Sequence, residues 1–327
     1  MSGVIGIGNA LTDIMTKLHN DEILSKLEYP KGSMQLVDKT ASQKVLEVIK
    51  DMPQTIASGG SAANTIHGLA KLGIITAFIG KVGVDKFGTF FSTDLKNSGI
   101  SPILLNSETE SGCAIAMVTP DSERTFATFL GAAVELTAND IKEEYFSGYK
   151  YFHIEGYLLQ NHELMIKAAS EAKKAGLLVS LDLASFNVVE ANRDFLHDFV
   201  KKYVDIVFAN EEEAKAYTGK NPQESVHLIA EECMIAVVKL GKEGSLVKNN
   251  GNVYTISSIK ANSIDTTGAG DLYAAGFLYG LINNLSFEKC GKIGSLLSGK
   301  VIETIGAKMS EEVWNEVKTQ VKIIEVE

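Results

Sequence analysis

The sequence predicts an α/β protein with a mostly parallel sheet covered by helices and with a small additional β lid. From about residue 151 onward, short apolar runs alternate regularly with segments of helical spacing, which is typical of parallel strands joined by helices. Two polar segments rich in β-forming residues, about 13–38 and 101–131, do not fit this alternation. We expect them to form the lid, at the carboxyl ends of the core strands where such sheets bind ligands.

The elements of the first half are predicted from local patterns. Residues 4–8 form an apolar run that ends in Gly and Asn, as expected of a buried first strand. The further expected elements are helices at 41–49, 61–72 and 87–96, a strand at 74–80, and β segments at 113–118 and 125–130 around a turn at 119–123.

The second half contains the regular alternation. The expected strands are 151–154, 177–181, 206–209 and 235–240, and the expected helices are 162–174, 211–218, 270–282, 287–302 and 311–323. We expect an amphipathic run from Leu272 to Leu281. Because no internal repeat or Pro-rich linker is visible, we expect residues 1–327 to form one domain that includes the lid.

Composition narrows the class of protein. The chain has 327 residues, of which 45% are hydrophobic and 22% charged, as in soluble globular proteins. Its net charge of −10 argues against nucleic acid or an anionic membrane as the main partner, although a small anionic substrate stays open. Cys113, Cys233 and Cys290 form no CxxC pair and are interpreted as free thiols. With no leader before Val4, a cytoplasmic protein is expected.

The segment Asp265–Asp271 is the most informative stretch. It reads Asp-Thr-Thr-Gly-Ala-Gly-Asp and opens a predicted helix. The small residues Gly268, Ala269 and Gly270 leave backbone N–H groups free to close on an anion, which the helix dipole also favours. Asp271 beside such an anion hole would repel the anion, but it is suited to take a proton from a hydroxyl that attacks a phosphate held there. An ordinary helix start with an acidic first turn is the alternative.

A second glycine-rich element precedes the helix at 61–72. Gly59 and Gly60 let the backbone approach a ligand closely, and Asn64 could bond vicinal hydroxyls. A helix cap by Ser58 or Ser61 is the alternative. Asn9 and Asp13 follow the first strand, at a carboxyl end where ligands bind, although a turn would also explain Asp13.

Two further elements follow predicted strands. Asn210 and Glu213 begin a helix, where Asn210 could lie near phosphate and Glu213 could bind water around Mg²⁺; helix-dipole stabilisation explains the acidic residues equally well. Gly241 and Gly244 follow the strand at 235–240 and could border a nucleotide, or form a plain turn.

Several motifs of other enzyme classes are missing from the sequence. No GxxxxGK[S/T] occurs, which excludes a P-loop nucleotide enzyme, and no GxGxxG follows a strand, which argues against an NAD-dependent oxidoreductase. The six histidines are scattered, so none is assigned a catalytic role.

In combination and order, these motifs resemble the PfkB or ribokinase family of carbohydrate and nucleoside kinases. The resemblance spans nearly the whole chain and implies a Rossmann-like core with a β lid, ATP and Mg²⁺, and a sugar or nucleoside acceptor, with some similarity to the adenosine-kinase branch. We expect a monomer or homodimer. A non-catalytic sugar- or nucleoside-binding regulatory protein on the same fold is the alternative.

The family resemblance also implies residue roles. Asp271 would be the catalytic base, with Gly268, Ala269 and Gly270 as the anion hole for the transferred phosphoryl group. Asn9, Asp13, Gly59, Gly60, Asn64 and Glu155 would bind the acceptor, Asn210, Glu213, Lys239, Gly241 and Gly244 would bind ATP, and Asp265 and Thr267 match a potassium site of some members. Lys239 departs from the family, because many members have Thr there.

Overall fold

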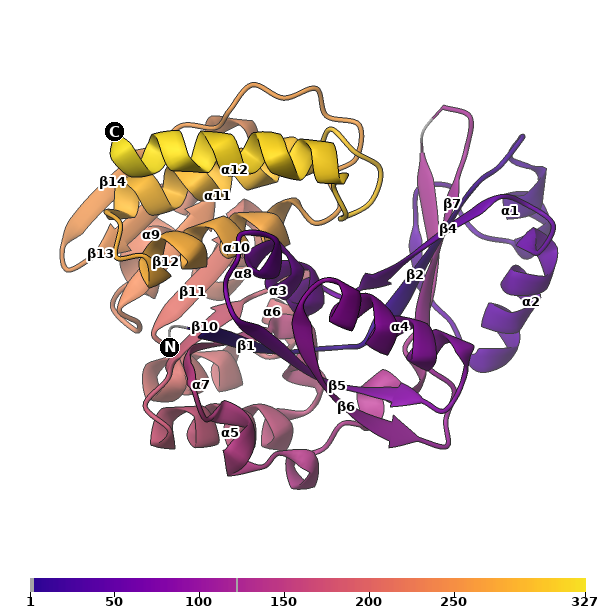
Figure 1. The fold of residues 1–327 in the computed structure, drawn as a ribbon, viewed down its shortest axis with the longest axis horizontal. Coiled ribbons are helices and arrows are strands. Elements are labelled where there is room, and N and C mark those ends of the chain that lie inside the picture. Colours follow the sequence, from indigo (N-terminus) through magenta and orange to yellow (C-terminus); the bar gives the residue numbers. More distant parts are fainter. Residues whose placement is uncertain (1–2, 122) are drawn as a thin grey trace.

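The computed structural model describes residues 3–121 and 123–327 and confirms the predicted α/β class (Figure 1). One sheet contains β1 (Gly3–Ile7), β5 (Thr76–Gly83), β6 (Ile100–Ser107), β9 (Tyr149–Glu155), β10 (Leu178–Asp182), β11 (Ile206–Asn210), β12 (Ile235–Lys239), β13 (Ser245–Asn249) and β14 (Asn252–Ile256). A smaller sheet contains β2 (Leu11–Lys17), β3 (Met34–Leu36), β4 (Gln54–Gly59), β7 (Gly112–Val118) and β8 (Arg124–Phe129).

Helices cover both faces of the large sheet and one face of the small sheet. They are α1 (Glu22–Leu27), α2 (Lys39–Ile49), α3 (Ser61–Lys71), α4 (Lys86–Asn97), α5 (His162–Lys174), α6 (Phe186–Ala191), α7 (Arg193–Tyr203), α8 (Glu211–Thr218), α9 (Pro222–Ile229), α10 (Ala269–Ile282), α11 (Phe287–Val301) and α12 (Glu311–Val326). No helix within the described ranges is long and apolar enough to cross a membrane.

The large sheet has the order β14-β13-β12-β11-β10-β9-β1-β5-β6. Pairing is parallel from β6 through β12, whereas β13 and β14 add antiparallel strands at one edge. Because β1 lies between β5 and β9, the chain leaves β1 toward one side of the sheet and later returns to the other. The carboxyl end of β1 is therefore at a switch point, where open α/β sheets bind ligands.

Helices cover both faces of the large sheet because neighbouring strand residues point to opposite sides. Ile5 packs in the core that includes α5, α7, α8 and α9, while Val4 packs in the core that includes α3, α4, α10, α11 and α12. The small sheet has its own core, in which Ile14 and Ile115 pack with residues of α1 and α2. The alternate residues Asp13 and Ala114 face the opposite way, toward the main cavity.

The second sheet differs from the predicted lid ranges in two places. Residues 100–107 form β6, which pairs with β5 in the large sheet, so the lid prediction from residue 101 was wrong for this part. Conversely, β4 belongs to the small sheet through its antiparallel pairing with β2, although no lid strand was predicted there. The apolar pattern of β4 is weak because its first three residues are exposed and it ends in glycine.

Helix α10 also differs from its prediction. The run from Leu272 to Leu281 was expected to be amphipathic, but most of α10 is buried, with Leu272, Phe277 and Leu278 fully covered. It packs between α3 and α11 (Figure 1). No residue of α10 is exposed, so the helix lacks the polar solvent-facing side of an amphipathic helix. Its neighbours α3 and α11 hold it in place.

Candidate active site

A cavity of about 1010 Å³ lies between the carboxyl edge of the large sheet and the small sheet. This volume is at the upper end of the range of roughly 300–1,000 Å³ that is common for small-molecule sites. Most of the residues predicted for the site line it. They are Asn9, Asp13, Gly60, Asn64, Glu155, Asn210, Glu213, Lys239, Gly241, Gly244, Thr267, Gly268, Ala269, Gly270 and Asp271.

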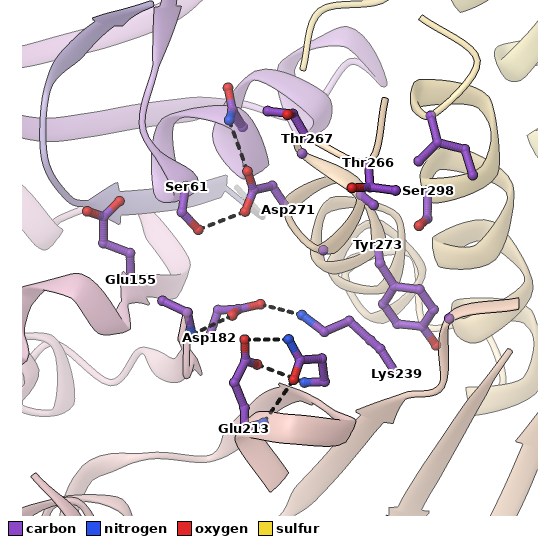
Figure 2. A pocket seen from close by; sticks show the side chains of 18 of the residues that line it. Ser61, Glu155, Asp182, Glu213, Lys239, Thr266, Thr267, Asp271, Tyr273 and Ser298 are labelled. Atoms are coloured by element: carbon purple, nitrogen blue, oxygen red, sulfur yellow. Dashed lines mark hydrogen bonds and ion pairs between the residues drawn. The ribbon is translucent and has the colours of Figure 1, made fainter. Parts of the chain in front are cut away.

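The cavity has two chemically different ends. The charged end consists of Asp182, Glu213, Lys239 and the N-terminus of α10 (Figure 2). The apolar end consists of side chains on or beside strands of the small sheet. They are Leu11, Met34, Leu36, Ala114, Phe126 and Leu130.

The N-terminus of α10 presents backbone donors to the charged end. Gly268 precedes the helix with φ 77°, which a side chain rarely adopts, and a Cβ there would lie 2.6 Å from Ala307 Cβ. The N–H of Ala269 donates to Thr266 O over 3.2 Å, so this member of the predicted anion hole is already engaged. Within the described ranges the N–H groups of Gly268, Gly270 and Asp271 have no protein acceptor, which leaves these three available to an anion.

Asp271 lies where α10 meets α3. Ser61 Oγ donates to its Oδ1 over 2.7 Å (Figure 2). Asn64 Nδ2 donates to its Oδ2 over 2.9 Å. Burial raises the pKa of Asp271 to about 6, against the lowering effect of these two bonds. A carboxyl group with that pKa is ionised at neutral pH and is still a competent proton acceptor.

The hydroxyl groups near the start of α3 do not cap the helix, contrary to the alternative interpretation of Ser58 and Ser61. The N-cap is Gly60, which has φ 94° and no side-chain cap bond. Ser61 is turned toward Asp271, and Ser58 Oγ donates to Asp94 Oδ2 over 2.6 Å. The residues that would cap an isolated helix are thus used for contacts between elements.

Glu155 ties together the end of β1 and the start of α3. Its Oε1 accepts hydrogen bonds from both the N–H and the side-chain amide of Asn9, each over 2.8 Å. Its Oε2 accepts from the N–H of Ala62 over 2.9 Å. Burial raises the pKa of Glu155 to about 7, while these bonds lower it. Glu155 thus links the backbone after β1 to the first turn of α3.

Asp13 reaches the cavity from the small sheet, not from the end of the first strand as expected. It belongs to β2, where it pairs with Ala57 of β4. Its carboxylate lies over Gly59, since a Cβ at Gly59 would be 2.1 Å from Asp13 Oδ1. Burial raises the pKa of Asp13 to about 7, with an opposing contribution from Lys308 and a further rise from Asp271.

Two residues of the site were missed by the sequence interpretation. Asp182 ends β10, and its Oδ2 accepts from Lys239 Nζ over 2.8 Å. Lys308 lies in the loop before α12 and donates to Ser58 Oγ over 3.2 Å, with its pKa lowered to about 8 by burial. Asp182 could have been suspected from its position at the end of a strand, whereas no local signal marks Lys308.

Lys239 places a positive charge beside the N-terminus of α10. A Cβ at Gly270 would lie 2.9 Å from Lys239 Nζ. Burial lowers the pKa of Lys239, but nearby Asp182 and Glu213 outweigh it, so the pKa is raised overall and the side chain is cationic. The only other basic residue among the described lining residues is Lys242, in the turn after β12.

Asn210 and Glu213 form a capping box at the start of α8. Asn210 Oδ1 accepts from the N–H of Glu213 over 2.8 Å, and Glu213 Oε2 accepts from the N–H of Asn210 over 2.7 Å. Burial raises the pKa of Glu213 to about 7. Both residues still line the cavity, as do Gly241 and Gly244, which form the turn between β12 and β13.

Asp265 and Thr267 precede the anion hole and are engaged by the protein. Arg124 of β8 forms an ion pair with Asp265 and a hydrogen bond with Thr267 Oγ1. The described residues contain no cluster of three or more His, Cys, Asp or Glu side chains that could hold a metal ion. Cys113, Cys233 and Cys290 are free thiols, as predicted.

Comparisons with known proteins give a consistent result. The profile described as pfkB family carbohydrate kinase matches residues 33–314. A 5-dehydro-2-deoxygluconokinase of Bacillus licheniformis is 30% identical over 277 residues, which cover 79% of this chain and 85% of the relative.

Two solved structures are similar over 98% of this chain at 33% identity. One is a probable sugar kinase from Rhizobium etli CFN 42, with a TM-score of 0.87 and 98% of its own chain covered. The other is an adenosine kinase from Sinorhizobium meliloti, with a TM-score of 0.86 and 99% covered. The relatives thus include both sugar and nucleoside kinases.

Proposed function

The chain belongs to the pfkB family of carbohydrate kinases, and from this premise we propose that it transfers the γ-phosphoryl group of ATP to the primary hydroxyl of a neutral nucleoside. As a member, it is a phosphotransferase that acts on an alcohol group. The choice of acceptor within sugars and nucleosides is our own inference from the cavity.

The lining of the apolar end carries this proposal. Met34 and Leu36 of β3 are 61% and 64% exposed and line the cavity beside other apolar side chains, and exposed apolar side chains that gather in this way fit a site that a flat apolar ligand covers. Phe126 adds an aromatic surface suited to stacking on a base.

The charges near the apolar end favour a neutral acceptor. Asp13 lies on the same face of the small sheet, and Asp271 is close enough to raise its pKa. Of the described lining residues contributed by the small sheet, none is basic. A sugar acid would place its carboxylate near Asp13 and Asp271. The cation nearest to Asp13 is Lys308, which is bonded to Ser58 and does not line the cavity, so the acidic groups would be only partly offset and binding would cost free energy.

Phosphoryl transfer follows from the geometry of the charged end. The acceptor hydroxyl would lie against Asp271, which takes its proton as the new O–P bond forms and the bond to ADP breaks. The N–H groups of Gly268, Gly270 and Asp271, together with Lys239, would stabilise the charge on the transferred group. The small sheet would exclude water, which otherwise competes as acceptor.

Nucleotide and magnesium ion are assigned to the charged end. Asn210, Glu213, Lys239, Gly241 and Gly244 are proposed to border ATP. The donor set fits a Mg²⁺ that keeps its own water, because this ion binds one or two carboxylates together with phosphate oxygens and water. Asp182 and Glu213 line the cavity, and since their oxygens already accept bonds from Lys239 and Asn210, they would hold the ion through its water. When bound, Mg²⁺ would neutralise part of the phosphate charge.

The proposal is tested with a panel of acceptors and ATP. Product formation is followed by ADP release and by mass spectrometry of the phosphorylated acceptor, using ribonucleosides, neutral sugars and 5-dehydro-2-deoxygluconate. We expect a ribonucleoside to exceed the sugar acid in kcat/KM by at least about 100-fold, a ratio that differences in polar contacts can supply. A preference for the sugar acid, or ATP hydrolysis with no phosphorylated acceptor, would contradict it.

A further inference from the structure

The loop before α10 is organised by one buried carboxylate. Asp265 is 3% exposed, and its Oδ1 accepts from the N–H of Thr267 over 2.6 Å. Its Oδ2 accepts from the N–H of Gly306 over 2.7 Å, in the loop that packs Ala307 against Gly268. The carboxylate therefore fixes the backbone from which the N–H donors of the anion hole project.

A buried carboxylate needs a compensating positive charge. Arg124, the first residue of β8, supplies it from the small sheet: its Nη1 forms an ion pair with Asp265 Oδ1 and bonds Thr267 Oγ1. The side chain of Arg124 is 19% exposed and that of Asp265 is 2% exposed. Because a guanidinium group keeps its proton at every pH relevant to proteins, this charge is permanent.

The same two side chains are those that the family resemblance assigns to a potassium ion, and they do not fit one here. A monovalent cation is held by oxygen atoms that replace its hydration shell. Asp265 Oδ1 and Thr267 Oγ1 both bond Arg124, and Asp265 Oδ2 bonds Gly306. A second cation beside this guanidinium group would also be repelled.

We propose that the guanidinium group of Arg124 takes the place of the monovalent cation, so that this kinase works without potassium. The inference rests on the proposed function for its activity readout. Since Arg124 belongs to the small sheet, the charge that holds the anion-hole loop is delivered by the element that covers the apolar end. Arg124 is thus a positioning residue for the anion hole.

The test compares the parent with Arg124→Met in KCl and in choline chloride at equal ionic strength. Arg193→Met is the matched control, because Arg193 is the only other arginine, bonds Tyr217 O and does not line the cavity. We expect parent turnover to differ by less than about twofold between the salts, since salt then acts only by screening. Arg124→Met should lose at least about tenfold in choline chloride, as expected when a buried charge loses its partner. Arg193→Met should behave like the parent.

Thermal unfolding gives a readout that does not depend on turnover. Without added nucleotide, Arg124→Met should unfold about 2–4 °C below the parent in choline chloride, and KCl should restore part of this loss. The proposal is overturned if KCl stabilises or strongly activates the parent, or if Arg124→Met matches the parent in choline chloride. If no acceptor is phosphorylated, the proposed function fails, but the unfolding temperatures still decide the role of Arg124.

Discussion

The two ends of the cavity are built in opposite ways. The charged end is formed by residues at the carboxyl ends of β10, β11 and β12, which are strands of the large sheet, and by the first turn of α10, which packs between α3 and α11. The apolar end is formed by side chains from strands of the small sheet that are distant in sequence. We infer that the first end performs chemistry common to the family, whereas the second selects the acceptor.

The largest effect is expected for Asp271, which is proposed to act as the base between the two ends of the cavity. Asp271→Asn keeps the shape and hydrogen-bonding capacity of the side chain but removes the base, so turnover should fall by roughly 10²–10⁴. Binding of ATP and acceptor, measured by calorimetry, should stay nearly unchanged. Asp198→Asn, on the exposed face of α7, is the control. Turnover of Asp271→Asn within a fewfold of the parent would contradict the assignment of Asp271 as the base.

A somewhat smaller loss is expected at the anion hole. Gly270→Val adds branched carbon atoms at a position where even a Cβ would lie 2.9 Å from Lys239 Nζ, and so obstructs the approach of a phosphoryl group. Turnover should fall by roughly 10²–10³, the weight of one oxyanion donor, with a smaller change in ATP affinity. Single-turnover kinetics separate the two effects. If a folded Gly270→Val turns over normally, the anion hole lies elsewhere.

How far the sequence predicts this arrangement differs between the two ends. Two glycine-rich motifs, residues 59–64 and 265–271, are each contiguous in the sequence. The starts of the two helices and the position of Asp271 could therefore be predicted from local patterns. The strand at Leu11–Lys17 was missed, and Asp13 was consequently placed at the end of β1. Register with β4 and β7 fixes its position, and pairing between distant segments leaves little local trace.

Other features of the structure also left no clear pattern in the sequence, for physical reasons. Strand β13 contains Lys248 and lies in an antiparallel edge of the sheet, so its apolar pattern is interrupted. Lys308 and Arg124 act at long range through ion pairs or buried contacts, which no spacing rule predicts. Burial of α10 on nearly all sides explains why its polarity pattern was misleading.

A smaller effect concerns the ionisation of Asp13. Its folded-state pKa of about 7 exceeds the ordinary value of 3.8, so this group destabilises the fold increasingly as pH rises from about 4 to 7. Asp13→Asn should therefore raise the free energy of unfolding by roughly 1–2 kcal/mol at pH 8, and by less at pH 5. Urea unfolding at both pH values checks this. Asp121→Asn is the control, because the pKa of Asp121 is lowered to about 2 and no such gain is expected. An equal gain for Asp13→Asn at both pH values would contradict the assigned pKa.

The division of the cavity into two ends is tested most directly by paired steady-state kinetics of Asp13→Ala and Lys239→Met. Asp13→Ala should lower kcat/KM for the acceptor by a factor that corresponds to a loss of roughly 1–3 kcal/mol of transition-state stabilisation. It should change the KM for ATP by less than about twofold. Lys239→Met should raise the KM for ATP and leave the KM of the acceptor nearly unchanged. Loss of ATP affinity in Asp13→Ala, with the acceptor unaffected, would show that the two ends have been assigned the wrong way round.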